Sequence, residues 1–249
     1  MTRLSVNLNK IALLRNARDI GLPSVIDSAK TVINAGAYGI TVHPRPDERH
    51  IKYDDVFELN KLLAGYPDIE FNIEGNPFTG RYMEIMEKVR PDQATLVPDS
   101  PDANTSDHGW EIEGCREKLT DVIRKIKNMG IRVSLFMDPS PEEIAKTGSL
   151  GADRIELYTE PFAAAFKSGK ALKEVTEKYI KSAESAGKLK LAINAGHDLN
   201  LENLEYFCSN VPDIKEVSIG HALVADAIDM GLDKTVKKYL EILKRTGDL

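Results

Sequence analysis

The sequence predicts a closed (β/α)8 TIM barrel with extra helices, formed by residues 1–249 as one domain. Eight short apolar runs alternate with helical patterns along the chain, which is the order of elements in such a barrel. The length of 249 residues also suits eight β/α units. A doubly wound sheet is the competing fold, but it requires a G-x-G-x-x-G turn after an early strand, and the sequence has none.

The predicted strands are short and mostly uninterrupted in apolar character, as expected for parallel strands that helices cover. In chain order they are Leu4–Leu8, Gly39–Val42, Ile69–Ile73, Gln93–Val97, Ile131–Phe136, Arg154–Leu157, Leu189–Ile193 and Val217–Ile219. No linker rich in Pro, Gly or Ser and no low-complexity tract separates them. The sequence therefore predicts no domain boundary.

Glycines mark the ends of four predicted helices, each directly before a strand: Gly36, Gly130, Gly151 and Gly187. A glycine just past a helix takes the left-handed conformation, so each glycine predicts a helix end. Helix starts are marked too. Pro23 begins the helix that ends at Gly36, and Ser140–Glu143 is a capping box with Pro141 at the first helical position.

The composition excludes several classes of protein. The chain is 42% hydrophobic and 29% charged, with a net charge of −6, and no lysine-rich tract or basic stripe predicts binding to nucleic acid. The N-terminal residues predict no signal peptide, and no apolar stretch approaches the length of a membrane span. Cys115 and Cys208 lack metal-ligand spacing and are expected to be free thiols in a reducing cytoplasm.

Polar residues end nearly every predicted strand, at the edge where TIM barrels place their active sites. They are Asn7 with Asn9 and Lys10, His43 with Arg45, Glu74, Asp99, Asp138, Glu156 with Tyr158, Asn194 with His197, and Gly220 with His221. Because the ends of parallel strands converge at the mouth of the barrel, these side chains are expected to form one site.

Two of these strand ends predict proton transfer. Prolines stiffen the loop that holds His43, Arg45 and His50, so that an imidazole able to move a proton lies beside a group that grips phosphate or carboxylate. Glu74 closes a strand in which residues 70, 72 and 74 share one face. Burial in a barrel mouth would raise the pKa of this carboxyl toward use as a general base.

Two segments predict phosphate sites. Asn194–His197 and Ser218–His221 follow the seventh and eighth strands, where small glycines let backbone N–H groups face an anion at a helix N-terminus. The segment from Asn7 to Arg18 follows the first strand and offers two amides, a lysine and two arginines, which suit hydroxyl groups and a second phosphate.

Together these motifs resemble the pyridoxine 5′-phosphate synthase family over essentially the whole chain. The segments that carry the resemblance are Arg15–Arg18, Gly39–His50, Leu96–Pro98, Asn194–His197 and Ile219–Ala222. The resemblance implies a TIM barrel with extra helices, a homo-octamer in the cytoplasm, and no cofactor or metal. It also implies the condensation of 1-deoxy-D-xylulose 5-phosphate with 3-amino-2-oxopropyl phosphate, which gives pyridoxine 5′-phosphate, inorganic phosphate and water in vitamin B6 biosynthesis.

The resemblance also implies residue roles. His43 and Glu74 match proton acceptors, His197 a proton donor, and Glu156 a group that stabilises a charged transition state. Positions that hold the deoxyxylulose phosphate match Asn7, Arg45, His50 and Thr105, and those that hold the aminoketone phosphate match Arg18, Asp198, Gly220 and His221. Of these, Thr105 comes from the resemblance alone.

The chain departs from the family at three places, one of which is Pro98-Asp-Ser-Pro101, where the family has a more basic run. Asn7-Leu8-Asn9-Lys10 replaces the common Asn-Ile-Asp-His, so that an amide and an ammonium group stand for an acid and an imidazole. We expect Lys10, with Asn9 beside it, to donate to the deoxyxylulose phosphate in place of that imidazole. Asp198 stands where the family often has glycine, so a nearby phosphate would experience its carboxylate.

Two other functions are compatible with the residue types. A metal-dependent barrel lyase or isomerase acting on a phosphorylated sugar could use His43, Glu74 and His197 as two imidazole ligands and one carboxylate ligand. A barrel could also bind a phosphorylated ligand without catalysis. Metal analysis distinguishes the first alternative, and release of phosphate from the mixed substrates distinguishes the second.

Overall fold

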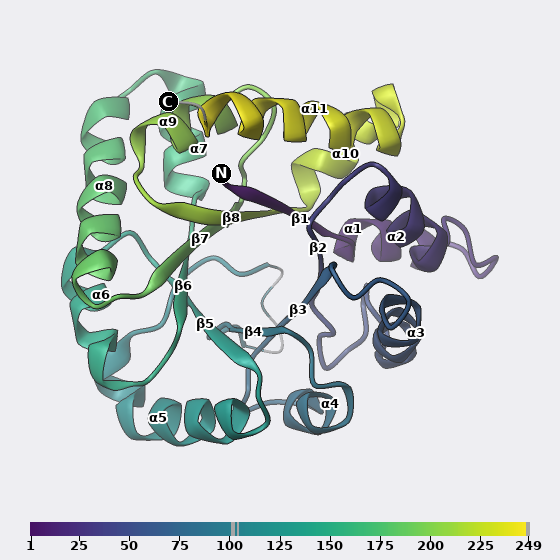
Figure 1. Cartoon of the computed structure of the whole chain (residues 1–249), viewed down its shortest axis with the longest axis horizontal. Coiled ribbons are helices and arrows are strands. Elements are labelled where there is room, and N and C mark those ends of the chain that lie inside the picture. Colours follow the sequence, from purple (N-terminus) through teal and green to yellow (C-terminus); the bar gives the residue numbers. More distant parts are fainter. Residues whose placement is uncertain (101–102, 104, 248–249) are drawn as a thin grey trace.

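The computed structural model describes residues 1–100, 103 and 105–247, and its strands close into a barrel in the order β1 to β8 (Figure 1). Every neighbouring pair is parallel, including β1 with β8. The strands are β1 (Arg3–Asn7), β2 (Gly39–Val42), β3 (Glu70–Gly75), β4 (Gln93–Leu96), β5 (Arg132–Met137), β6 (Arg154–Leu157), β7 (Ala192–His197) and β8 (Ile214–Ile219). The predicted barrel fold is therefore confirmed.

Helices surround the barrel on its outside (Figure 1). They are α1 (Asn9–Asn16), α2 (Val25–Asn34), α3 (Tyr53–Leu63), α4 (Tyr82–Val89), α5 (Ile112–Asn128), α6 (Pro141–Lys146), α7 (Glu160–Ser168), α8 (Leu172–Lys188), α9 (Leu204–Asn210), α10 (His221–Met230) and α11 (Leu232–Thr246), with a 3₁₀ turn η1 (Thr147–Ser149). The barrel therefore has more helices than the one per strand that a minimal barrel needs, as predicted. The last helix, α11, packs against α2, α9, α10 and β1, so the end of the chain lies beside its beginning.

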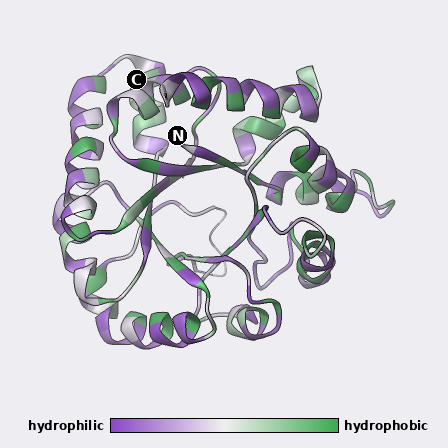
Figure 2. Ribbon diagram, in the orientation of Figure 1, coloured by the Kyte–Doolittle hydropathy of each residue, from purple (hydrophilic) through white to green (hydrophobic). Residues whose placement is uncertain are grey.

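Apolar side chains fill the space between the strands and the helices. On the ribbon, hydrophobic residues face the barrel and hydrophilic residues face outward (Figure 2). Helices α7, α8 and α9 contact one another through the buried rings of Phe162, Tyr179 and Phe207, one from each helix. The rings meet edge to face, with centroids 4.9 Å apart for Phe162 and Phe207 and 5.4 Å apart for Tyr179 and Phe207. The hydroxyl of Tyr179 also donates to the backbone O of Tyr158 at 2.7 Å, which links this cluster to the end of β6.

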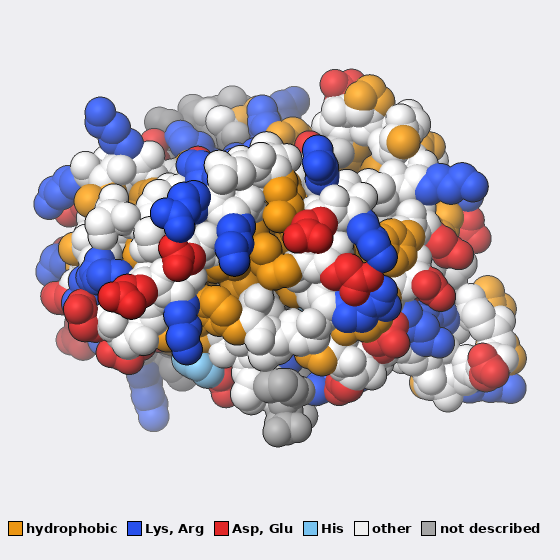
Figure 3. Space-filling model, turned by 90° about the horizontal axis from the view of Figure 1, so that it is seen from below, with side chains coloured by type: hydrophobic (Ala, Val, Ile, Leu, Met, Phe, Trp, Pro, Cys, Tyr) orange, Lys and Arg blue, Asp and Glu red, His pale blue; other side chains and the backbone are white. Residues whose placement is uncertain are grey.

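The surface mixes charges of both signs. On the face seen in Figure 3, Lys and Arg alternate with Asp and Glu, and hydrophobic side chains show between them. Within the described part of the chain, no helix combines the length and the apolar character needed to cross a membrane.

Polar side chains lie on the inner face of the barrel, whereas the predicted strands are mostly apolar along their length. Hydroxyl and amide groups join β1 to β4 across the barrel: Ser5 Oγ lies 2.7 Å from Thr41 Oγ1, and Asn72 Nδ2 donates to Thr41 Oγ1 at 3.3 Å. Thr95 Oγ1 donates to Asn72 Oδ1 at 3.0 Å. Only the outer face of each strand packs against helices, so apolar character is required there and polar residues are tolerated inside when they pair with one another.

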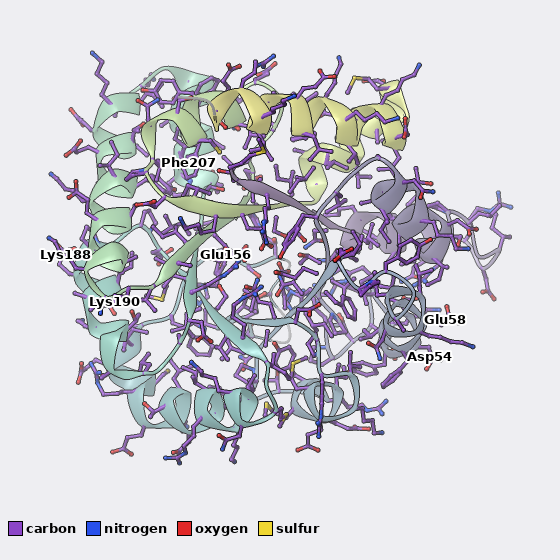
Figure 4. All side chains as sticks on the ribbon, in the orientation of Figure 1. Asp54, Glu58, Glu156, Lys188, Lys190 and Phe207 are labelled. Atoms are coloured by element: carbon purple, nitrogen blue, oxygen red, sulfur yellow. The ribbon has the colours of Figure 1, made fainter. Side chains whose placement is uncertain are left out.

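Strand β7 was predicted at Leu189–Ile193 but spans Ala192–His197. Helix α8 runs through Gly187, and Lys190 takes the left-handed conformation that was expected of that glycine, with φ 61°. Leu191 N donates to Ala186 O and Lys190 N to Gly187 O, both at 3.0 Å, which is a Schellman motif. The helix therefore ends three residues late, at the turn between the labelled Lys188 and Lys190 (Figure 4).

The other helix signals agree with the structure more closely. Gly36, Gly130 and Gly151 have positive φ as predicted. Ser140 Oγ accepts from Glu143 N at 3.3 Å with Pro141 in the first turn, but the carboxylate of Glu143 accepts from the backbone N of Ile112 instead of completing the capping box. Near Pro23, the helix begins two residues later than expected, at Val25, capped by the Ser24 side chain.

Candidate active site

The polar strand ends surround one cavity of about 300 Å³ at the mouth of the barrel. It is lined by Asn7, Asn9, Lys10, His43, Arg45, His50, Glu74, Val97, Thr105, Ser106, Phe136, Glu156, His197, Asp198, Ser218, Gly220 and His221. Every residue whose role the family resemblance implies lines it except Arg18, which is exposed in the turn after α1. The role of Arg18 therefore stays a prediction. Four of the other predicted strand-end residues do not line it: Asp99, Asp138, Tyr158 and Asn194.

Three lining residues were not predicted: Val97, Ser106 and Phe136. The alternation of side chains along a strand could have found two of them, because Val97 and Phe136 each lie an even number of residues from a side chain on the inner face of their strand. Val97 and Phe136 form a small buried cluster with Tyr158. This cluster gives an otherwise polar cavity an apolar wall.

Glu74 lies at the end of β3 with its side chain 13% exposed. Its Oε2 accepts from Asn7 Nδ2 at 3.3 Å and lies 3.8 Å from His43 Nδ1. Burial raises the pKa of this carboxyl to about 7, with Asp99 acting in the same direction and His197 in the opposite one. A group with this pKa can both take up and release a proton near neutral pH, as the sequence predicts for Glu74.

Glu156 reaches the cavity from β6, inside the barrel (Figure 4). Its Oε2 is buried without a hydrogen-bond partner among the described residues. Burial, and after it the nearby Glu74 and Glu216, raise the pKa of Glu156 well above its usual range. A Cβ on Gly196 would lie 3.1 Å from Glu156 Oε1 and 2.5 Å from Ser218 O, so glycine is needed there to make room for the carboxyl.

His43 begins the loop after β2, and two asparagines hold it. Asn7 Oδ1 accepts from Asn9 N, and Asn9 Oδ1 in turn accepts from His43 N, both at 2.9 Å. Burial, together with the positive charge of Arg45, lowers the pKa of His43 well below its usual range. The ring is therefore neutral at physiological pH and can accept a proton.

His50 lies in the same loop as His43 and Arg45. The backbone N–H of Ile51 donates to His50 Nδ1 at 2.9 Å, which places the proton of a neutral ring on Nε2. Burial and the charge of Arg45 lower the pKa of His50 to about 3, so the ring stays neutral. His50 can thus offer an uncharged N–H group to the cavity.

Arg45 is buried and already has partners. Its guanidinium donates to the carboxylate of Asp99 and to the backbone O of Ala103, and Ser106 Oγ donates to the same carboxylate at 2.7 Å. Asp99 therefore ties the segment after β4 to the loop after β2. Asp99 was expected at a strand end, but nothing in the sequence indicated this ion pair.

Two further cationic side chains, Lys10 and Arg15, differ in their contacts. Lys10 lines the cavity at the first turn of α1 and has no ion pair among the described residues. Arg15, which the sequence suggested for phosphate binding, instead forms an ion pair with Asp55 and donates to His50 O at 3.1 Å. Arg15 therefore stabilises the loop that holds His50.

The predicted phosphate cradle lies between the ends of β7 and β8. Gly220 is the residue before α10, and a Cβ there would lie 3.1 Å from the Cβ of Asn7. His221, the first residue of α10, lines the cavity beside it. In the described ranges, no group of three or more His, Cys, Asp or Glu side chains is placed to hold a metal ion, and the predicted set of His43, Glu74 and His197 is no exception.

Comparison with known proteins places this cavity in context. Residues 4–245 match the model of the family described as "Pyridoxal phosphate biosynthesis protein PdxJ". The pyridoxine 5′-phosphate synthase of Christiangramia forsetii is 50% identical over 244 residues, which cover 98% of this chain and all of that protein. The synthase of Cytophaga hutchinsonii is likewise 50% identical over 247 residues, covering 98% of this chain and all of that protein.

Solved structures with low identity share the fold. The 3-keto-L-gulonate-6-phosphate decarboxylase of Vibrio cholerae superposes with a TM-score of 0.66 at 11% identity, covering 98% of both chains. The phosphoribosyl anthranilate isomerase of Thermotoga maritima superposes with a TM-score of 0.61 at 13% identity, covering 98% of this chain and 99% of that one. At such identity the likeness concerns the barrel alone.

Proposed function

The chain belongs to the family of the pyridoxal phosphate biosynthesis protein PdxJ, its function is the synthesis of pyridoxine 5′-phosphate in vitamin B6 biosynthesis, and we propose that the buried Glu74 carboxyl carries the proton transfers. One observation supports this role above all. Glu74 has a pKa of about 7 and lies beside the neutral ring of His43. A carboxyl in this state can exchange a proton with a bound substrate in either direction.

The proposed substrates are 1-deoxy-D-xylulose 5-phosphate and 3-amino-2-oxopropyl phosphate. In the reaction an amine attacks a ketone, a phosphate group leaves, the ring closes through a carbon–carbon bond, and water is lost. Every one of these steps moves a proton, which suits a cavity that holds two carboxyls and two imidazoles capable of proton transfer. The alternative of binding without catalysis gives no reason for two buried carboxyls that have no ion pair with Lys or Arg in the described part of the chain.

The proposed roles assign proton acceptors and a donor to different strands. Glu74 and His43 accept protons, and His197 donates one from β7, which lies four strands from β3 in the barrel order. The raised pKa of Glu156 favours its uncharged form, which can donate a hydrogen bond to an oxygen on which negative charge develops. Its partnerless Oε2 is available for that bond.

Two groups of residues bind the substrates in this proposal. The deoxyxylulose phosphate is held by Asn7, Asn9, Lys10, Arg45, His50 and Thr105. The aminoketone phosphate is held by Arg18, Asp198, Gly220 and His221, with Asp198 acting through its backbone. Because Arg18 lies outside the cavity, its contribution requires a movement of the turn after α1 or a second copy of the chain.

We further propose that residues 1–249 act as one catalytic domain, in the cytoplasm, and as a homo-octamer. Exposed apolar side chains on α1 and the turn after it, Leu13, Leu14, Ile20 and Leu22, support association of copies, because a monomer rarely leaves so many close together in water. Sedimentation of the purified chain tests the assembly.

A product assay with both substrates tests the function. Glu74→Gln keeps the shape of the side chain but cannot take up a proton, and should lower the rate of pyridoxine 5′-phosphate formation by roughly 10²- to 10⁴-fold, the usual contribution of a positioned base. Glu58→Gln is the matched control, since Glu58 is exposed on α3 and points away from the barrel (Figure 4). A Glu74→Gln rate within about threefold of the parent would remove Glu74 from the mechanism.

A further inference from the structure

His197 is held on three sides at the end of β7. Its backbone has φ 68°, a conformation that few residues other than glycine adopt. Its ring packs edge-on against the ring of Tyr158, with centroids 5.3 Å apart. Its two nitrogens have different partners: Nδ1 lies 2.8 Å from Asp198 Oδ2, and Nε2 lies 3.0 Å from Thr105 Oγ1.

The partner at Nδ1 determines where the ring carries its proton. A carboxylate can only accept a hydrogen bond, so the 2.8 Å contact requires a proton on Nδ1. In the neutral ring, Nε2 is then the acceptor, and Thr105 Oγ1 can donate to it. When the ring gains a second proton, that proton is on Nε2, next to Thr105, which lines the cavity together with His197.

The carboxylate of Asp198 is well placed to keep this bond. The hydrogen bond from His197 lowers the pKa of Asp198, so the group is ionised at neutral pH. Asn203 Nδ2 donates to the backbone O of Asp198 at 3.2 Å, and the next residue, Leu199, is fully buried. The backbone on both sides of the carboxylate is therefore anchored.

We propose that Asp198 is a positioning residue, which fixes the tautomer and the ring orientation of His197 so that Nε2 is the atom that exchanges a proton with substrate. This inference rests on the proposed role of His197 as proton donor. It assigns the Asp198 side chain to the imidazole, while the aminoketone phosphate meets only its backbone.

A second pair in the same chain provides the contrast. His108 Nδ1 lies 2.6 Å from Asp107 Oδ1, but their side chains are 57% and 65% exposed, against 27% and 39% for His197 and Asp198. An exposed pair of this kind does little to fix the orientation of the imidazole ring, because water competes for both partners. Asp107 also acts on His197 only through space, as Glu74 does from β3. Asp107→Asn is therefore a matched control that removes a nearby charge but no bond to His197.

The test uses ¹⁵N NMR of the imidazole nitrogens in the full-length chain without substrate. In the parent, His197 should show a protonated Nδ1 and an unprotonated Nε2 when neutral. Asp198→Ala should give a mixture of both tautomers, whereas Asp107→Asn should match the parent. An unchanged tautomer in Asp198→Ala would overturn the proposal, since the carboxylate would then not determine the site of protonation.

Kinetics supply the second arm. Asp198→Asn keeps an acceptor oxygen but loses the charge, and should lower kcat by roughly ten- to a hundredfold, as for other residues that orient an imidazole, with a smaller change in KM. A loss confined to KM would overturn the positioning role and assign Asp198 to substrate binding. His197→Gln separates the two proposals: full activity of this variant would refute the donor role of His197, while the tautomer measurement would still decide what Asp198 does.

Discussion

Both ends of the barrel interior hold buried glutamates, but these glutamates differ in their ion-pair partners. At the end away from the cavity, Glu70 pairs with Arg132, and Glu216 pairs with Arg154, whose Nη1 lies 3.0 Å from its Oε2. At the mouth, Glu74 and Glu156 have no ion pair with Lys or Arg within the part of the chain that the structure describes. The guanidinium at the mouth, on Arg45, is paired with Asp99 instead.

The difference separates structural carboxyls from reactive ones. A buried carboxylate beside a guanidinium can hold neighbouring strands together, although burial, and after it Glu70, still raise the pKa of Glu216 to about 8. A buried carboxyl without a cation also resists ionisation, but at the mouth it faces the cavity where a substrate can bind. At the mouth this resistance brings the pKa of Glu74 to about 7, in the range where a proton can be exchanged. Burial of these carboxyls thus lowers the stability of the barrel at the mouth, and the ion pairs at the other end can offset that loss.

The strongest test of this comparison removes a cation at the far end. Arg132→Met leaves the carboxylate of Glu70 buried without its partner, and should lower the free energy of unfolding by about 3–5 kcal/mol, measured by urea denaturation. The double variant Arg132→Met/Glu70→Gln should recover most of this loss. If Arg132→Met unfolds within about 1 kcal/mol of the parent, these ion pairs do not stabilise the barrel.

The converse test removes the unpaired carboxyl. Since the pKa of Glu74 is raised from 4.5 to about 7, the unfolded chain releases this proton at lower pH than the folded chain. The Glu74 carboxyl should therefore reduce the stability of the parent as the pH rises between about 4.5 and 7, by up to ~3 kcal/mol, and its contribution should stay constant above that range. Glu74→Gln cannot titrate, so it should be the more stable chain at pH 8.

Urea denaturation across the pH range measures this difference. The stability of Glu74→Gln relative to the parent should be near zero at about pH 4 and should increase toward about pH 8. Glu58→Gln should run parallel to the parent throughout, because Glu58 is exposed. A constant gap between Glu74→Gln and the parent would show that Glu74 ionises normally in the folded chain.

The smallest expected effect concerns the cation at the mouth that has no carboxylate partner. A charge-assisted contact contributes roughly 1.5–3 kcal/mol, so Lys10→Ala should weaken binding of 1-deoxy-D-xylulose 5-phosphate by about 10- to 150-fold in calorimetric titration. The aminoketone phosphate and the stability of the chain should be nearly unaffected. Lys61→Ala, an exposed lysine of α3, is the control, and equal affinity of parent and Lys10→Ala would mean that Lys10 faces solvent.

Much of the site could be predicted because the fold determines where strand ends converge. Once eight strands alternate with helices, His43, Glu74 and His197 must meet at one mouth, whatever lies between them in the sequence. Thr105 has no such signal, since it lies in the long connection after β4 and only the family resemblance indicated it. For Arg18 the fold of one chain gives no place in the cavity.

The sequence by itself determined the order of the elements, the barrel and the set of polar groups at its mouth, because these depend on local periodicity and on the position of each residue in its strand. Only the tertiary structure decided how those groups are paired. Arg45 binds Asp99, 54 residues away in the chain, and Glu156 has no ion pair among the residues that the structure describes. Charge and pKa depend on distance and burial, which no local pattern specifies, so the chemistry of Glu74 and the orientation of His197 emerge only when the barrel closes.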